Sequence, residues 1–224
     1  MIKPDCEINP LLKQAIEDTK RSKSSMGVTP RKPRKRREVP RKTPQAISPL
    51  LYIMKGKRDL VVAEIGVYKG ESSLLMLTNW SISKFYAVDT WSSQVYAEKD
   101  ADQRDLMHAP WNSIYKSVKK KLSPFSQVEI LKGTSKEHAA DLDNNILDFC
   151  FIDAAHDYES VKEDIHLWFP KVKKGGVIAG DDYHWPGVKR ALGEASHELG
   201  FADTLIHVFD EYDCKTKQWY AIVE

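Results

Sequence analysis

Three carboxylates follow two apolar stretches of the sequence, at the point where each stretch ends. Asp153 follows LDFCFI (147–152), and Asp181 and Asp182 follow VIAG (177–180). Adjacent carboxylates repel one another unless a cation or water lies between them. Oxygen ligands at this density suit a hard divalent cation such as Mg²⁺. These residues therefore predict a metal site, although a helix-capping Asp beside a solvated one would leave the same pattern.

A second candidate site lies in EIGVYKGESS (64–73). Gly66 and Gly70 permit a tight turn and a close approach of the backbone to a ligand. A helix that begins after Gly70 would point its first N–H groups at that ligand. The spacing is E-x-G-x-x-x-G, and the dinucleotide pattern G-x-G-x-x-G is absent because position 68 is Tyr. A plain turn remains the alternative.

Two further stretches extend this site. Asp89 lies about 20 residues beyond the glycine turn, where a carboxylate can accept hydrogen bonds from a ribose diol. The stretch GTSKEH (133–138) offers small polar groups that could line an adenine edge.

The elements that must position these residues alternate between strands and helices. Because this order builds βαβ units, it predicts an α/β fold: a doubly wound, mostly parallel sheet with helices on both faces and ligands beyond the carboxyl ends of its strands. Two C-terminal strands close in sequence suit an antiparallel hairpin. The predicted strands are 60–67, 84–91, 126–133, 147–155, 175–182, 203–210 and 217–224, and the predicted helices are 71–80, 111–122, 158–172 and 187–200.

Charge divides the chain into two parts. Of its 34 Lys and Arg and 32 Asp and Glu residues, residues 1–49 hold 13 and 5, so this segment carries +8 and the remainder −6. Eight bases lie between Arg31 and Lys42, among prolines and few large apolar side chains, which is typical of an extended arm. We expect a short helix and this basic arm over 1–46 and one globular domain over 47–224. The arm is either an electrostatic contact for nucleic acid or a solvated tail.

The composition of the chain bears on the compartment in which we expect the protein. No apolar run is long enough to span a membrane, and the N-terminus lacks the apolar core of a signal peptide. Three cysteines far apart in sequence favour reduced thiols, so we expect a cytoplasmic protein with no membrane partner. Residues 92–110 are long for a connection and are either a lid over a polar substrate or a surface insertion. Assembly with identical copies is compatible with the sequence, which does not fix their number.

The motifs together resemble a known family. EIGVYKGES is similar to the cofactor turn of catechol O-methyltransferase-type enzymes, and residues 151–183 resemble the branch that contains macrocin-type sugar O-methyltransferases. The resemblance covers roughly residues 58–224. It identifies the chain as a class I S-adenosylmethionine-dependent methyltransferase with a Rossmann-like fold, of the metal-dependent O-methyltransferase branch.

The resemblance implies a role for each matching position. The methionine end of S-adenosylmethionine would be held by the turn, the ribose by Asp89 and the adenine by Ser135; Asp153, Asp181 and Asp182 would bind Mg²⁺. Catechol enzymes have Asn at the position of Asp182, so this site would be more acidic. The implied cofactor-binding residues are Glu64, Gly66, Tyr68, Gly70, Ser72, Asp89, Thr90, Trp91, Ser135 and Asp153.

The expected reaction is methyl transfer to a hydroxyl oxygen of a small molecule or sugar. The sulfonium is already an activated methyl donor, so the protein must align the acceptor and remove its proton. His156 falls where catechol enzymes carry a lysine base, and His184 falls where some macrolide-sugar enzymes carry a histidine base. Either could be the base.

Three alternatives remain open at this point. A nucleic-acid or nucleotide methyltransferase would use the basic arm, although no Asn-Pro-Pro-Tyr-type motif is present. A nicotinamide oxidoreductase would share the sheet but is disfavoured by the glycine spacing and the paired aspartates. A non-catalytic binding module would not need Asp153, Asp181 and His156.

Overall fold

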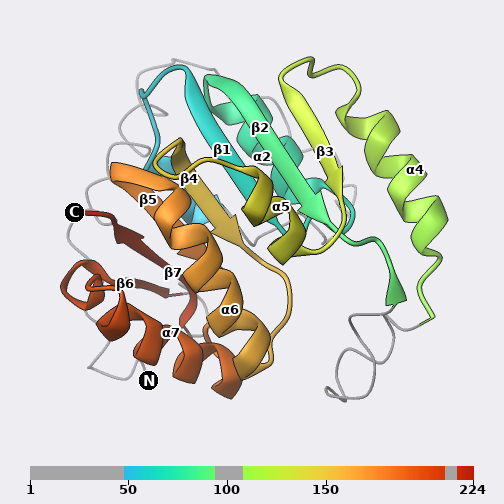
Figure 1. The fold of residues 1–224 in the computed structure, drawn as a ribbon. Coiled ribbons are helices and arrows are strands. Elements are labelled where there is room, and N and C mark those ends of the chain that lie inside the picture. Colours follow the sequence, from blue (N-terminus) through green and yellow to red (C-terminus); the bar gives the residue numbers. More distant parts are fainter. Residues whose placement is uncertain (1–47, 94–107, 210–215) are drawn as a thin grey trace, which may run out of the picture. The chain divides into compact units, whose positions relative to one another are not determined.

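A seven-stranded sheet forms the centre of the fold (Figure 1). The structure, a computed structural model, describes residues 48–93, 108–209 and 216–224, and Ala46–Glu224 form one compact unit. The strand order is β3-β2-β1-β4-β5-β7-β6. The strands are β1 (Leu60–Ile65), β2 (Ile82–Asp89), β3 (Val128–Lys132), β4 (Leu147–Ile152), β5 (Val172–Gly180), β6 (Ile206–Phe209) and β7 (Thr216–Ile222).

The strand pairing confirms the predicted fold class. The strands β1 to β5 pair in parallel, and β7 runs antiparallel to both β5 and β6. The chain therefore builds a doubly wound, mostly parallel sheet that ends in an antiparallel C-terminal hairpin.

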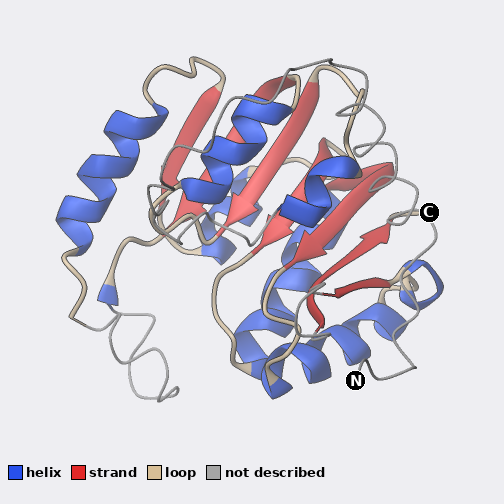
Figure 2. Ribbon diagram, turned by 180° about the vertical axis from the view of Figure 1, so that it is seen from behind, coloured by secondary structure: helices blue, strands red, loops and turns tan. Residues whose placement is uncertain are grey.

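Helices cover both faces of this sheet (Figures 1 and 2). One apolar cluster joins the sheet to η1, α2 and α4, and a second joins its other face to α5, α6 and α7. In Figure 1, α6 and α7 lie in front of the sheet, while α4 flanks β3 at its edge. The helices are η1 (Ser48–Tyr52), α2 (Glu71–Asn79), α4 (Trp111–Leu122), α5 (Ser135–Asp141), α6 (Tyr158–Trp168), η4 (Phe169–Lys171), α7 (Pro186–Glu198) and η5 (Ala202–Thr204).

Local sequence explains where these elements begin and which side they bury. Helix α4 buries Trp111, Ile114, Val118 and Leu122, which recur at helical spacing, and three of its four lysines are exposed. Strand β4 is apolar throughout its second half because Phe149 to Ile152 are covered on both faces. Asp157 caps α6 by accepting a hydrogen bond from the Ser160 N–H.

The structure differs from the predicted elements at several places. Helix α5 was not among the predicted helices. Strand β5 begins at Val172, ahead of the glycine pair, and ends at Gly180, before the two aspartates. Helix α6 ends at Trp168, because Pro170 lies in the 3-10 turn that follows.

Several predictions fall outside the described residues: the helix over 6–20, the basic arm, and positions 94–107 of the predicted lid. Across the described ranges, none of the helices is long and apolar enough to cross a membrane.

Candidate active site

The backbone brings the predicted site residues to one edge of the sheet. The Asp153 N–H donates to the Ile65 carbonyl at 2.8 Å, and the Asp181 N–H donates to the Ile152 carbonyl at 3.2 Å. These bonds continue the parallel ladder one residue past the ends of β4 and β5. Gly66, Asp153 and Asp181 therefore form a row across three neighbouring strand ends, at the edge where this kind of sheet binds ligands.

The glycine turn is shaped by close backbone contacts. Gly66 has φ +91°, and a Cβ there would overlap the Asp153 carbonyl group. Gly70 has φ +68° and precedes the first turn of α2. Side chains at both positions would be strained, so the turn requires glycine. The result is a backbone path that leaves the N-terminus of α2 open toward the crevice.

Glu64 lies beneath this turn and is fully buried. Its carboxylate accepts hydrogen bonds from the hydroxyls of Ser72 and Ser73, the second and third residues of α2. Burial raises the pKa of Glu64 to about 7, although the two serine hydroxyls act in the opposite direction. Glu64 and Ser72 thus fasten α2 to β1, and their predicted contact with a cofactor stays a prediction.

Asp89 joins the glycine turn to the end of β2. Its two carboxylate oxygens accept from the backbone N–H of Tyr68 at 2.7 Å and of Trp91 at 2.6 Å. The Trp91 indole in turn donates to the Tyr68 carbonyl at 2.9 Å. Burial raises the pKa of Asp89, while these backbone hydrogen bonds lower it. A carboxylate has about four lone-pair sites, so Asp89 can still accept from a ribose diol.

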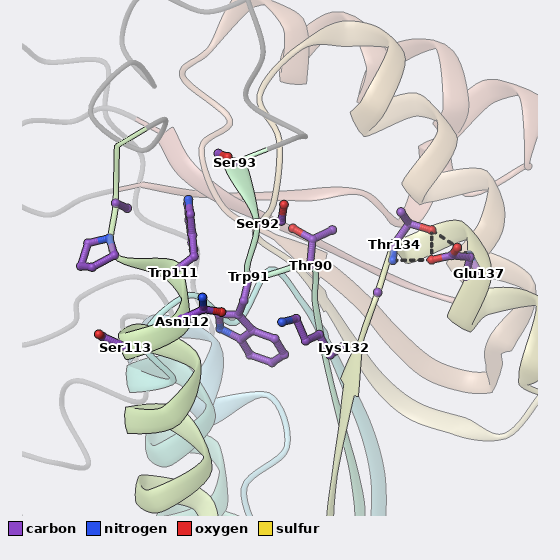
Figure 3. A pocket seen from close by; sticks show the side chains of 13 residues that line it. Thr90, Trp91, Ser92, Ser93, Trp111, Asn112, Ser113, Lys132, Thr134 and Glu137 are labelled. Carbon is purple, nitrogen blue, oxygen red and sulfur yellow. Dashed lines mark hydrogen bonds between the residues drawn. The ribbon is translucent and has the colours of Figure 1, made fainter.

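An open pocket of about 900 Å³ adjoins this junction (Figure 3). It lies between Thr90 and Trp91 after β2, the N-terminus of α4 and the end of β3 at Lys132. Thr134 and Glu137 also line it, and they are tied together as the capping box of α5. The pocket therefore extends from the predicted ribose site toward the stretch predicted to line the adenine.

The Ser135 hydroxyl interacts with two side chains of α6. It accepts a hydrogen bond from the Trp168 indole at 2.7 Å and interacts with the buried carboxyl group of Asp164. An adenine contact by Ser135 stays a prediction. If the Ser135 hydroxyl made that contact, it would be shared between the adenine and the side chains of α6.

The carboxylates of Asp153, Asp181 and Asp182 meet at the ends of β4 and β5. Together with His156 they line a cavity of about 10 Å³, which is roughly the space of one water molecule. The pKa of Asp153 is raised well above its ordinary value, first by burial and then by the neighbouring charges of Asp181, Asp182 and Glu64. Asp182 has φ +57°, and its N–H donates to Asp181 Oδ1 at 2.8 Å. The chain therefore gathers three carboxyl groups here, and Asp182 adopts a left-handed conformation that Asp tolerates better than most residues.

The two candidate bases are held differently. His156 Nε2 lies 2.7 Å from Asp182 Oδ2, and its ring stacks on Trp185 with 5.3 Å between the ring centroids. His184 Nδ1 lies 3.7 Å from Asp182 Oδ1, and 43% of its side chain is exposed, against 19% for His156. Both rings therefore contact Asp182 and Trp185, since the His184 and Trp185 centroids lie 5.5 Å apart, but His156 has the shorter carboxylate contact and the more buried side chain.

The donor chemistry suits a hard divalent cation, but the arrangement is not closed. Within the described ranges, no group of three or more His, Cys, Asp or Glu side chains is arranged to hold a metal ion. The Asp182 carboxylate faces His156 instead. The predicted cation therefore stays a prediction that rests on three carboxylates lining one cavity.

Sequence reasoning missed two residues at this edge. Gly187 lies in the first turn of α7, where a Cβ would overlap the His156 carbonyl, so it lets α7 approach the site. Gln218 lies on β7 beside the end of β5. Gly180 pairs with Trp219 in the antiparallel ladder, so Asp181 and Gln218 are the next residues on the two strands. Gln218 is 3% exposed, and among the described residues its Oε1 has no hydrogen-bond partner. The available signal was a glutamine directly before the apolar run WYAI that ends the strand.

Comparisons with known proteins agree with this geometry. Residues 63–183 match a family described as a methyltransferase domain. An uncharacterized protein of Acanthamoeba polyphaga mimivirus, R132, is 31% identical over 131 residues, which are 57% of this chain; the chain spans about half of that relative, 53% of its length.

Solved structures share the fold at low identity. The O-methyltransferase NovP superposes with a TM-score of 0.54 at 21% identity, covering 73% of this chain and 72% of NovP. Fibrillarin from Aeropyrum pernix, with natively bound S-adenosyl-L-methionine, superposes with a TM-score of 0.51 at 13% identity, covering 77% of this chain and 73% of fibrillarin. With the family match over more than half of its length, the chain belongs to the methyltransferase-domain family and has the class I S-adenosylmethionine-dependent methyltransferase fold.

Proposed function

We propose that this protein transfers a methyl group from S-adenosylmethionine to a hydroxyl oxygen of a small molecule or sugar, with His156 as the base. The observation that carries the proposal is the His156–Asp182 pair, 2.7 Å apart, at the same sheet edge as the glycine turn. It supports hydroxyl chemistry because a hydroxyl is mostly protonated at neutral pH and needs a base to become a good nucleophile.

The cofactor would lie along the row of strand ends. Gly66 and Gly70 would let its methionine end approach the backbone, and Asp89 would accept from its ribose. The sulfonium supplies the activated methyl group, so the chain's task is to align the acceptor oxygen with it. The open pocket beside Thr90 and Trp91 would have room for the adenosine end of the cofactor.

His156 is the better base of the two candidates. Its imidazole would take the acceptor proton, and Asp182 Oδ2 would hold the ring and stabilise the imidazolium that forms. Trp185 limits the ring's rotation by stacking on it. His184 has a longer contact with Asp182 and a more exposed side chain, which suits a contact with the acceptor better than proton removal.

A divalent cation is a further part of the proposal. Asp153, Asp181 and Asp182 would hold it, and Asp182 would have to turn away from His156 to do so. When bound, such an ion would lower the pKa of an acceptor hydroxyl and fix its position. Burial first, and then the charges of Asp181 and Asp182, raise the pKa of Asp153, and the second of these causes supports a cation at this place.

A nucleotide or nucleic-acid acceptor is the second candidate. It is favoured by the eight bases between Arg31 and Lys42. The nicotinamide alternative loses its basis, because the family match is to a methyltransferase domain.

The first test is calorimetric titration of S-adenosylmethionine into the purified protein, with and without Mg²⁺. Micromolar binding is expected, and a screen of sugars, catechols and nucleotides for methylation would follow. Absence of binding in both conditions would overturn the proposed function. Full turnover of an identified acceptor in EDTA would contradict the proposed cation but not the proposed methyl transfer.

A further inference from the structure

Helix α4 and the end of β3 share a lysine face, which consists of Lys116, Lys119, Lys120 and Lys132. The first three are spaced i, i+3 and i+4 on α4, so they lie on one side of the helix. All four residues are exposed. Lys119 and Lys132 converge, since their ammonium groups lie 5.5 and 4.7 Å from the centroid of the same Tyr115 ring.

The lysines of this face have no carboxylate partners, and they share this with most lysines of the described residues. Ion pairs are formed by Lys84, Lys136, Lys162 and Lys173. The face is distinguished by four unpaired lysines that lie together. Within the described ranges, none of the four lysines of the face forms an ion pair, and α4 contains no acidic residue. Like charges one helical turn apart repel one another, and a bound polyanion would remove this repulsion.

The face is also held in place next to the open pocket. The Tyr115 ring packs against Trp91 with 4.9 Å between centroids, so the two ammonium groups lie over a ring that is itself fixed. Lys132 and Trp91 both line the pocket, and Figure 3 shows their side chains beside one another. A ligand on the lysine face would therefore run past the mouth of the candidate active site.

We propose that the lysine face binds the phosphate backbone of a nucleic acid. Ammonium groups act as point charges toward phosphate, and a row of them reads charge without reading sequence. The chain carries a second run of bases between Arg31 and Lys42. A polymer with one charge per nucleotide can engage several of the four lysines at once, whereas a small anion can engage only one or two. This surface is independent of the identity of the methyl acceptor.

The test uses the full chain and a fluorescein-labelled single-stranded 20-nucleotide DNA, with the dissociation constant measured by anisotropy between 50 and 300 mM KCl. The face variant combines Lys116→Gln, Lys119→Gln and Lys120→Gln. Each lost phosphate contact lowers the slope of log K against log salt by about 0.7, so the variant should lose about two units, which is roughly 100-fold in affinity at 0.1 M salt. Its affinity for S-adenosylmethionine should not change.

The matched control is Lys57→Gln, Arg58→Gln and Lys174→Gln, three exposed bases near the amino ends of β1 and β5 that remove the same charge. Both triple variants are also made in a chain with Arg34→Gln, Lys35→Gln, Arg36→Gln and Arg37→Gln, which separates the arm from the face. Equal loss of slope in the two triple variants, or no binding by the unaltered chain at 50 mM KCl, would overturn the proposal. Equally effective competition by polyglutamate would overturn the assignment to nucleic acid.

Discussion

Asp164 is a carboxyl group that the fold keeps away from water. It lies on the inner side of α6 and is 7% exposed. Burial raises its pKa to about 7, and the interaction with the Ser135 hydroxyl offsets only part of this effect. Between about pH 4 and pH 7 the native state therefore holds a proton that the unfolded chain has released. The stability that this proton brings is complete below the unfolded pKa and is lost as the pH rises through 7.

Asp164→Asn should remove this loss. At pH 5 the variant should already be more stable by about 1.5 kcal/mol, because the unfolded chain has released this proton about one pH unit above its unfolded pKa. At pH 8 the variant should be more stable by up to about 4 kcal/mol, because one pKa unit corresponds to about 1.4 kcal/mol. Urea unfolding at both pH values measures the difference. The same difference at pH 5 and pH 8 would mean that Asp164 titrates normally.

The two histidines give a second prediction at the scale of single residues. His156→Ala should lower kcat for an identified acceptor by about 10² to 10⁴-fold, the usual loss when a general base is removed. His184→Ala serves as the matched control and should change KM more than kcat, because this ring is exposed and loosely paired. Steady-state kinetics and titration of S-adenosylmethionine separate the two effects. The assignment of the base would be reversed if His184→Ala caused the larger loss in kcat.

At the scale of elements, the β1–α2 turn depends on a glycine that another residue cannot replace. Gly66→Ala places a methyl group against the Asp153 carbonyl at a left-handed φ, so it should cost at least about 3 kcal/mol and weaken S-adenosylmethionine binding.

Gly193 in α7 is the matched control, since nothing lies within 4 Å of a Cβ built there. Gly193→Ala should stabilise the fold by about 0.5 to 1 kcal/mol. Thermal unfolding with and without cofactor compares the two substitutions. A tolerated Gly66→Ala would show that the turn can move away from β4.

Local signals decided which elements the sequence predicts. Strand and helix periodicity identified the five parallel strands, the C-terminal hairpin and helices α2, α4, α6 and α7 because each has a strong apolar pattern. Helix α5 was missed since its seven residues bury only Ala139 fully, although Thr134 and Glu137 carry a capping-box signal. The start of β5 was missed because Lys173, Lys174 and two glycines interrupt its apolar pattern.

The site was predictable to the extent that it depends on strand ends. Asp89 is the last residue of β2, and Asp153, Asp181 and Asp182 lie within two residues of the ends of β4 and β5, so topology alone gathers them at one edge. Side-chain partners were not predictable, because they depend on tertiary contacts. The Ser135 hydroxyl turns to α6 and the Asp182 carboxylate turns to His156, and neither contact has a local signature.

At the scale of the whole molecule, acidic side chains gather at the ends of the central strands β4 and β5. Asp153, Asp181 and Asp182 repel one another in the native state, whereas the unfolded chain can separate Asp153 from the other two. The fold therefore bears an electrostatic cost that a cation would remove. Anything that binds only the native state stabilises it by mass action, and Mg²⁺ at 100 times its dissociation constant would add about 2.7 kcal/mol.

This linkage gives a prediction that needs no methyl acceptor. For a domain of this size each kcal/mol shifts the Tm by about 2 to 4 °C, so saturating Mg²⁺ should raise the Tm by roughly 5 to 10 °C. Asp181→Asn should raise the Tm without metal, because it relieves the repulsion on Asp153, and should abolish the rise with Mg²⁺. Na⁺ at equal ionic strength controls for screening. If Mg²⁺ and Na⁺ shifted the Tm equally in the unaltered protein and in the variant, the three carboxylates would not form a cation site. Their charges would then only contribute to the raised pKa of Asp153.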